Sequence, residues 1–149
     1  MKDISLQIRN VIFYVLVPIF AILGIAIGRI IKLHFLLIVV LAITFGVLGL
    51  VLVVLTARLR ESRIQKIFFI LAGASAVGIP ICAILHNLVY GLFIPWFGEN
   101  FWERHVSGGD EPVFFILALL VCPALFLIGT VGSVVLLIMG RIEKAPNMP

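Results

Sequence analysis

Charged residues are scarce in this sequence. Asp, Glu, Lys and Arg make up 12% of the 149 residues, about half their share in an ordinary soluble domain. Hydrophobic residues reach 63%, and the mean hydropathy is +1.29. A chain of this length cannot bury so much apolar surface within itself. The composition therefore excludes an ordinary water-soluble fold and predicts a single membrane domain over residues 1–149.

Charge is absent from four long stretches, which cover residues 11–28, 33–55, 67–98 and 113–140. A helix crosses the hydrocarbon core with roughly 20 apolar residues, whereas barrel strands are shorter and alternate polar with apolar side chains. We therefore predict an all-α protein with four transmembrane helices in an antiparallel bundle. The expected segments are helices at about 10–29, 34–56, 67–91 and 112–139, a basic loop at 57–66, an outer loop at 92–111 and a tail at 140–149.

The predicted spans also lack acidic and basic residues at mid-bilayer depth, on which proton relays, proton-coupled carriers and voltage sensors depend. The chain is similar in size to the four-helix small multidrug exporters, but their membrane-embedded glutamate has no counterpart here. Its two cysteines form no Cys-x-x-Cys pair. Because no catalytic constellation is recognisable, we do not expect an enzyme.

Lys and Arg are distributed unevenly around the spans, with eight on one side and three on the other. Positive charge is retained in the cytoplasm, so both termini and the basic loop are predicted to be cytoplasmic, in a plasma or inner membrane. Because the net charge of +4 flanks apolar spans, no nucleic-acid partner is expected. The cations of the basic loop, which also lie at the level of lipid headgroups, are Arg58, Arg60, Arg63 and Lys66.

Small residues recur at four-residue spacing in three of the predicted helices. Such pairs let helix backbones approach closely, which matters because lipid gives helices no hydrophobic drive to associate. We interpret them as packing contacts within the bundle, and a homodimer face is the alternative. The pairs are Gly24 and Gly28, Ala74 and Gly78, and Gly129 and Ser133.

Cys82, His86 and Cys122 are expected at similar depths in helices three and four. The rise of an α-helix places the two thiols roughly 12 and 15 Å below the outer ends of their helices. His86 follows Cys82 by one helical turn, and His34 begins helix two on the same side. Cysteine and histidine suit Cu(I) or Zn, and two histidines can ligate haem. The alternative is that the cysteines are small buried hydrophobes, in which case no cofactor is needed.

The outer loop is rich in aromatic and acidic residues. Its aromatic residues recur at helix-like offsets, which predicts a short amphipathic helix lying in the membrane interface and anchored by tryptophan. Asp110 is the expected N-cap of helix four, and Glu111 is favourable beside the helix dipole. A surface for a partner or a cation is the alternative, with the candidates Trp96, Glu99, Trp102, Glu103, His105, Asp110 and Glu111.

Two classes of function remain. The favoured hypothesis is a noncatalytic membrane component, a subunit, scaffold or interaction protein that contacts the lipid bilayer and another membrane protein or a second copy of itself. The alternative is a metal- or haem-binding protein of electron transfer or transport that uses Cys82, His86, Cys122 and His34. The pattern of residues specifies neither a substrate nor a partner.

Overall fold

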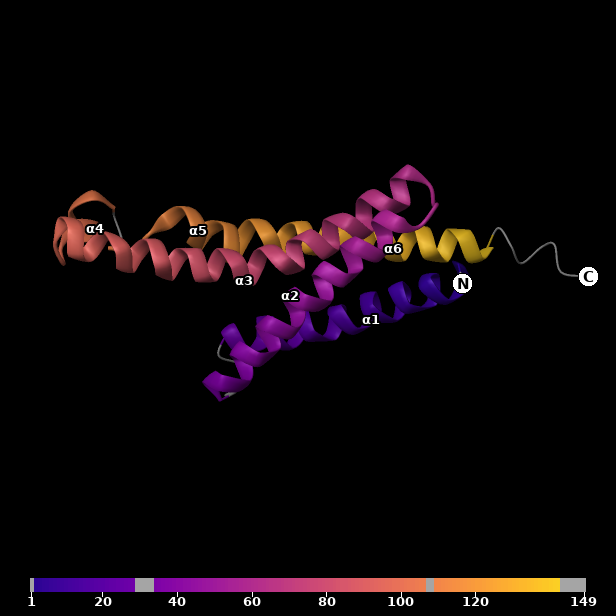
Figure 1. The fold of residues 1–149 in the computed structure, drawn as a ribbon, viewed down its shortest axis with the longest axis horizontal. Helices are drawn as coiled ribbons and strands as arrows, with labels where there is room; N and C mark the ends of the chain where they lie inside the picture. Colours follow the sequence, from indigo (N-terminus) through magenta and orange to yellow (C-terminus); the bar gives the residue numbers. More distant parts are fainter. Residues whose placement is uncertain (1, 29–33, 107–108, 143–149) are drawn as a thin grey trace, which may run out of the picture.

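The structure is a computed structural model that describes residues 2–28, 34–106 and 109–142. Most of the predicted tail at 140–149 lies outside these residues. The described part consists of helices joined by short connections and contains no strand (Figure 1). In chain order it consists of α1 (Lys2–Ile27), α2 (Phe35–Arg58), α3 (Arg63–Phe97), α4 (Phe101–His105), α5 (Pro112–Ile116), a π-helical turn η1 (Leu117–Val121) and α6 (Cys122–Ile142).

Four helical segments are long and apolar enough to cross a membrane, which confirms the all-helical, multi-pass class predicted from the sequence. Their bounds differ from those of the expected spans. Helix α1 begins well before residue 10, and α3 extends beyond both ends of 67–91. The thickness of a bilayer determines the minimum length of a helix that spans it, but not the maximum length. The four segments are Ile4–Ile27, Phe35–Arg58, Arg63–Phe97 and Pro112–Met139.

The ends of α3 follow from its flanking residues. The Ser62 side-chain oxygen accepts the Gln65 amide N–H at 3.3 Å, which satisfies one of the free donors at the helix start. At the other end, Gly98 has a φ of 93°, a conformation that glycine adopts easily and other residues rarely do. The helix therefore continues for 35 residues and includes Trp96, which we had assigned to the outer loop.

A π-helical turn separates α5 from α6, directly before the Cys122–Pro123 dipeptide. Proline has no amide proton, so the carbonyl four residues earlier loses its usual donor. A π turn is a common local adjustment inside an α-helix and shifts the hydrogen-bond register by one residue. The span therefore remains helical from Pro112 to Met139.

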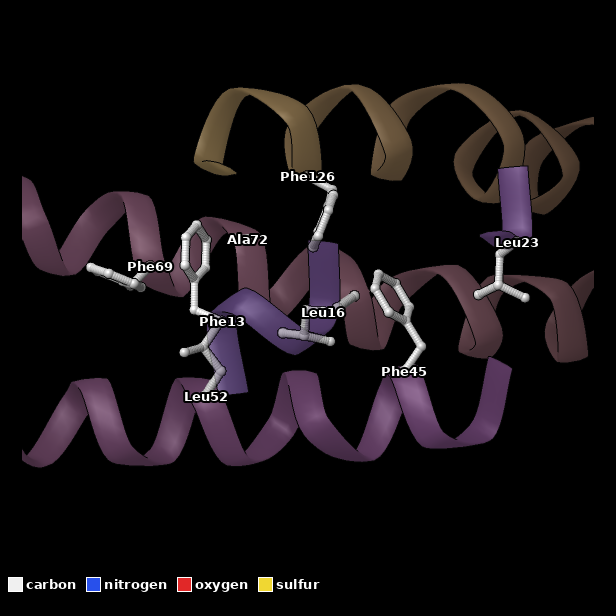
Figure 2. Close-up of a cluster of buried hydrophobic side chains, with 9 residues drawn as sticks. Phe13, Leu16, Leu23, Phe45, Leu52, Phe69, Ala72 and Phe126 are labelled. Atoms are coloured by element: carbon white, nitrogen blue, oxygen red, sulfur yellow. The ribbon is translucent and has the colours of Figure 1, made fainter. Parts of the chain in front are cut away.

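The core lies where the helices come together. Helix α2 packs against both α1 and α3, and α3 also packs against α6. Figure 2 shows Phe45 from α2 and Phe126 from α6 pointing toward Leu16 of α1. Phe13 of α1 meets Phe69 of α3 edge-on, with 5.0 Å between ring centres. All four long helices therefore contribute to one cluster of buried apolar side chains.

Glycine allows the closest helix contacts. A Cβ added to Gly49 of α2 would lie 2.8 Å from the carbonyl oxygen of Gly73 on α3. A Cβ added to Gly129 of α6 would lie 2.6 Å from the backbone nitrogen of Ala72. Real Cβ atoms essentially never come so close to other atoms, so any other residue would force the backbones apart. Ser133, one turn after Gly129, is fully buried.

The other predicted small-residue pairs behave differently. A Cβ at Gly24 would meet no atom within 4 Å, and Gly28 and Ala74 are exposed. Gly78 does make a contact, because its Cβ would lie 2.9 Å from the Cys122 sulfur. Within the described residues, the Gly24–Gly28 pair therefore does not serve the intramolecular packing that we expected.

Gly129→Leu should destabilise the protein by about 1–3 kcal/mol, because the larger side chain overpacks the contact between α6 and α3. Gly24→Leu is the matched control and should change stability by less than about 0.5 kcal/mol, because position 24 is exposed. Thermal unfolding in a single detergent, followed by circular dichroism, measures both effects. Equal losses in the two variants would contradict this view of the packing.

Candidate functional sites

His86 connects the second half of α3 to the start of α5. Its Nδ1 atom lies 3.1 Å from the Glu111 carbonyl oxygen and 3.3 Å from the Glu111 Oε2 atom. Its Nε2 atom lies 3.5 Å from an Asp110 carboxylate oxygen. Glu111 is buried with 3% of its surface exposed, whereas Asp110 is exposed. Three predicted site residues thus form one cluster, in which the imidazole is within hydrogen-bond distance of Glu111 and within ion-pair distance of Asp110.

Glu111 caps the helix that begins at Pro112, so the prediction that Asp110 is the cap was wrong. The Glu111 carboxylate accepts the Val113 amide at 2.7 Å and the Phe114 amide at 3.0 Å. Asp110 instead accepts the amide of Glu111 at 2.8 Å. The sequence contained the relevant signal, because proline favours the first helical position and the cap directly precedes it.

The remaining outer-loop candidates do not join this cluster. Trp102 is buried, and its ring nitrogen donates to the Tyr90 carbonyl oxygen at 3.2 Å, so that α4 packs back on α3. The predicted amphipathic segment is therefore divided between the end of α3 and the five-residue α4. Its position at a membrane interface stays a prediction. The exposed candidates are Trp96, Glu99, Glu103 and His105.

The side chains of Cys82 on α3 and Cys122 on α6 lie close enough to interact, and both cysteines are free. His86 is directed toward Glu111, and His34 is exposed at the start of α2. Among the described residues, no group of three or more His, Cys, Asp or Glu side chains is arranged to hold a metal ion. The structure thus brings two of the four predicted ligands together.

A buried ion pair that sequence reasoning missed lies at the opposite end of α3. The Arg9 guanidinium on α1 binds the Glu61 carboxylate in the basic loop and is 0% exposed. It also donates to the Asn10 side-chain oxygen at 2.7 Å and lies 4.0 Å from the centre of the Phe69 ring. The pair therefore holds α1, the basic loop and α3 together. No local pattern links Arg9 to a residue 52 positions away.

An apolar groove of about 640 Å³ opens between α2 and α3. Figure 1 shows the α1–α2 pair diverging from the α3–α6 pair toward the end that carries α4. A smaller hollow of about 240 Å³ shares Ala83 and Asn87 with the groove and extends to His86. The groove is lined by Phe35, Val39, Ala42 and Ile43 of α2 and by Pro80, Ala83, Ile84, Asn87 and Leu88 of α3.

Comparison with known protein families, curated proteins and solved structures gives no match for this chain. Within the described residues, the distinctive features are the His86 cluster, the thiol pair, the Arg9–Glu61 ion pair and the groove between α2 and α3. Of the two hollows described, the groove has the larger volume.

Glu61→Gln should destabilise the protein by about 3 kcal/mol, because it leaves the buried charge of Arg9 without its partner. Glu103→Gln is the control, since Glu103 is exposed on α4, and its effect should stay below about 0.5 kcal/mol. Unfolding by heat or denaturant in detergent measures both values. Similar small effects in the two variants would show that the ion pair does not stabilise the fold.

Proposed function

We propose that this chain is a noncatalytic membrane interaction protein that holds a transmembrane helix of a partner protein in the groove between α2 and α3. In this proposal it crosses the bilayer four times as an antiparallel bundle, in a plasma or inner membrane. Both termini and the basic loop face the cytoplasm, because eight of the eleven Lys and Arg residues lie on that side of the predicted spans. Segment α4 lies at the opposite interface.

The outward-facing side chains of the spans support insertion into a bilayer. Large apolar residues outside the groove, such as Leu36, Leu120 and Val131, project from the spans and are all more than 60% exposed. Contact of such surface with water costs roughly 25 cal/mol per Å². Hydrocarbon removes this cost, and helices can enter it because they satisfy their own backbone hydrogen bonds.

The shape of the groove is the observation that carries the proposal. Helices α2 and α3 are in close contact at Gly49 and Gly73 but leave a large hollow between Phe35 and Leu88, which line its far end. Unfilled space of this kind forfeits the dispersion contacts of a close-packed interior. Side chains of a partner helix can fill it at nearly native density, as they do at other helix contacts in membranes.

Asn87 favours a protein helix over a lipid tail as the occupant. In the described part of the chain, its side-chain amide makes one hydrogen bond, to the Ala83 carbonyl oxygen at 2.8 Å. Asn87 lines the groove, and its second amide proton and side-chain oxygen have no hydrogen-bond partner among the residues that the structure describes. An unpaired amide is costly in hydrocarbon. A polar residue on a partner helix can pair with it, whereas an acyl chain cannot.

A photoreactive amino acid at Ile84, inside the groove, should cross-link to one discrete protein in membranes of the native host. The control is the same amino acid at Leu120, which is exposed on η1 and lines neither hollow. Illumination followed by gel analysis and mass spectrometry identifies the products. Lipid adducts alone at position 84, or the same protein products at both positions, would overturn the proposal.

A second candidate function is soft-metal binding, which the proximity of Cys82 and Cys122 favours because thiolates select Cu(I) and Zn. Protein purified from metal-replete cells should then contain close to one metal ion per chain. Cys122→Ser should abolish this content. A metal-free and colourless protein would exclude both a metal and a haem.

A further inference from the structure

We propose that the basic loop binds the headgroup phosphate of an anionic glycerophospholipid through Arg58, Arg60 and Arg63. The inference rests on the proposed membrane insertion, which places this loop at the level of the headgroups. It is independent of the groove between α2 and α3, which lies on a different part of α3.

The three arginines are exposed and lie close together in the chain, around the short connection between α2 and α3. No ion pair to any of them occurs in the ranges that the structure describes. Guanidinium groups donate to two phosphate oxygens at once, in a planar arrangement that an ammonium group does not provide. The loop thus offers several unpaired donors of the type that recognises phosphodiesters.

Internal contacts remove the opposing charge from this surface. Glu61 is the one acidic residue of the loop, and its carboxylate is bound to the buried guanidinium of Arg9. Lys66, the fourth cation of the loop, donates from its ammonium group to the Ala57 carbonyl oxygen at 3.3 Å, near the end of α2. The ion pair therefore prevents Glu61 from competing with an anion for the exposed arginines.

The loop is held in place before any ligand binds. Leu59 is buried, and Ser62 caps the first turn of α3. Together with the Glu61 and Lys66 contacts, these interactions fix the backbone that carries the arginines. Little backbone entropy is then lost on binding, which favours affinity.

Two apolar side chains identify a lipid, instead of a free phosphate, as the ligand. Ile64 and Ile67 at the start of α3 are each 60% exposed, directly after the arginines in sequence. Acyl chains of a bound lipid can cover them while the headgroup contacts the guanidinium groups. Inorganic phosphate could use only the arginines.

Binding of fluorescent phosphatidylglycerol to the purified full chain in a neutral detergent tests this site. The triple variant Arg58→Gln/Arg60→Gln/Arg63→Gln should bind roughly 100-fold more weakly, and Arg60→Gln alone roughly fivefold more weakly. The matched control Arg29→Gln/Lys32→Gln/Arg104→Gln removes the same charge from the other predicted side. Its affinity should change by less than about threefold, since screening limits the effect of distant charges.

An equal loss of affinity in the triple variant and the matched control would contradict the proposed site, because binding would then depend on net charge alone. If inorganic phosphate competed as strongly as unlabelled phosphatidylglycerol, the proposal that the ligand is a lipid would be contradicted. Circular dichroism checks that each variant is folded, and the single variant provides the test if the triple variant is not. Failure of this proposal leaves the cross-linking result at Ile84 unchanged, so the two proposals fail separately.

Discussion

Peptide groups inside a bilayer must find their hydrogen-bond partners within the protein, and this requirement determines most of the architecture. Helices meet it residue by residue, so their apolar side chains can face hydrocarbon directly. At the helix ends, side chains supply the missing partners, as Ser62 does for Gln65 and Glu111 does for Val113 and Phe114. With the backbone satisfied in this way, the exposed apolar surface of the spans is stable only in a medium without water.

Packing divides the molecule into a close-packed region and an open one. Glycines at positions 49, 73 and 129 bring α2, α3 and α6 into direct backbone contact, and the Arg9–Glu61 pair fixes α1 against the basic loop. Farther along α3, the helices separate and leave the groove. A rigid region beside a preformed groove favours binding, because a ligand does not have to order the site. In our proposal for the basic loop, the same ion pair also keeps Glu61 away from the exposed arginines.

The fold class and the number of candidate spans were predictable because transfer into hydrocarbon acts on windows of about 20 residues, which the sequence displays directly. The burial of individual residues was not predictable from the sequence. Gly24 and Gly129 have the same local pattern, but of the two only Gly129 faces another helix among the described residues. Arg9 and Glu61 pair across 52 positions, beyond any local signal. Of the candidate residues, His86, Asp110 and Glu111 form one cluster and Cys82 and Cys122 another, whereas Glu99, Glu103 and His105 remain apart on the surface.

Alkaline extraction of membranes from the native host tests most directly whether lipid surrounds the four helices. This treatment releases peripheral proteins and leaves integral ones in the sedimented bilayer. The full-length chain should remain in the pellet after high-speed centrifugation and enter solution only when detergent is added. Recovery of the folded chain in the detergent-free supernatant would contradict membrane insertion, and with it the proposals for the groove and for the basic loop.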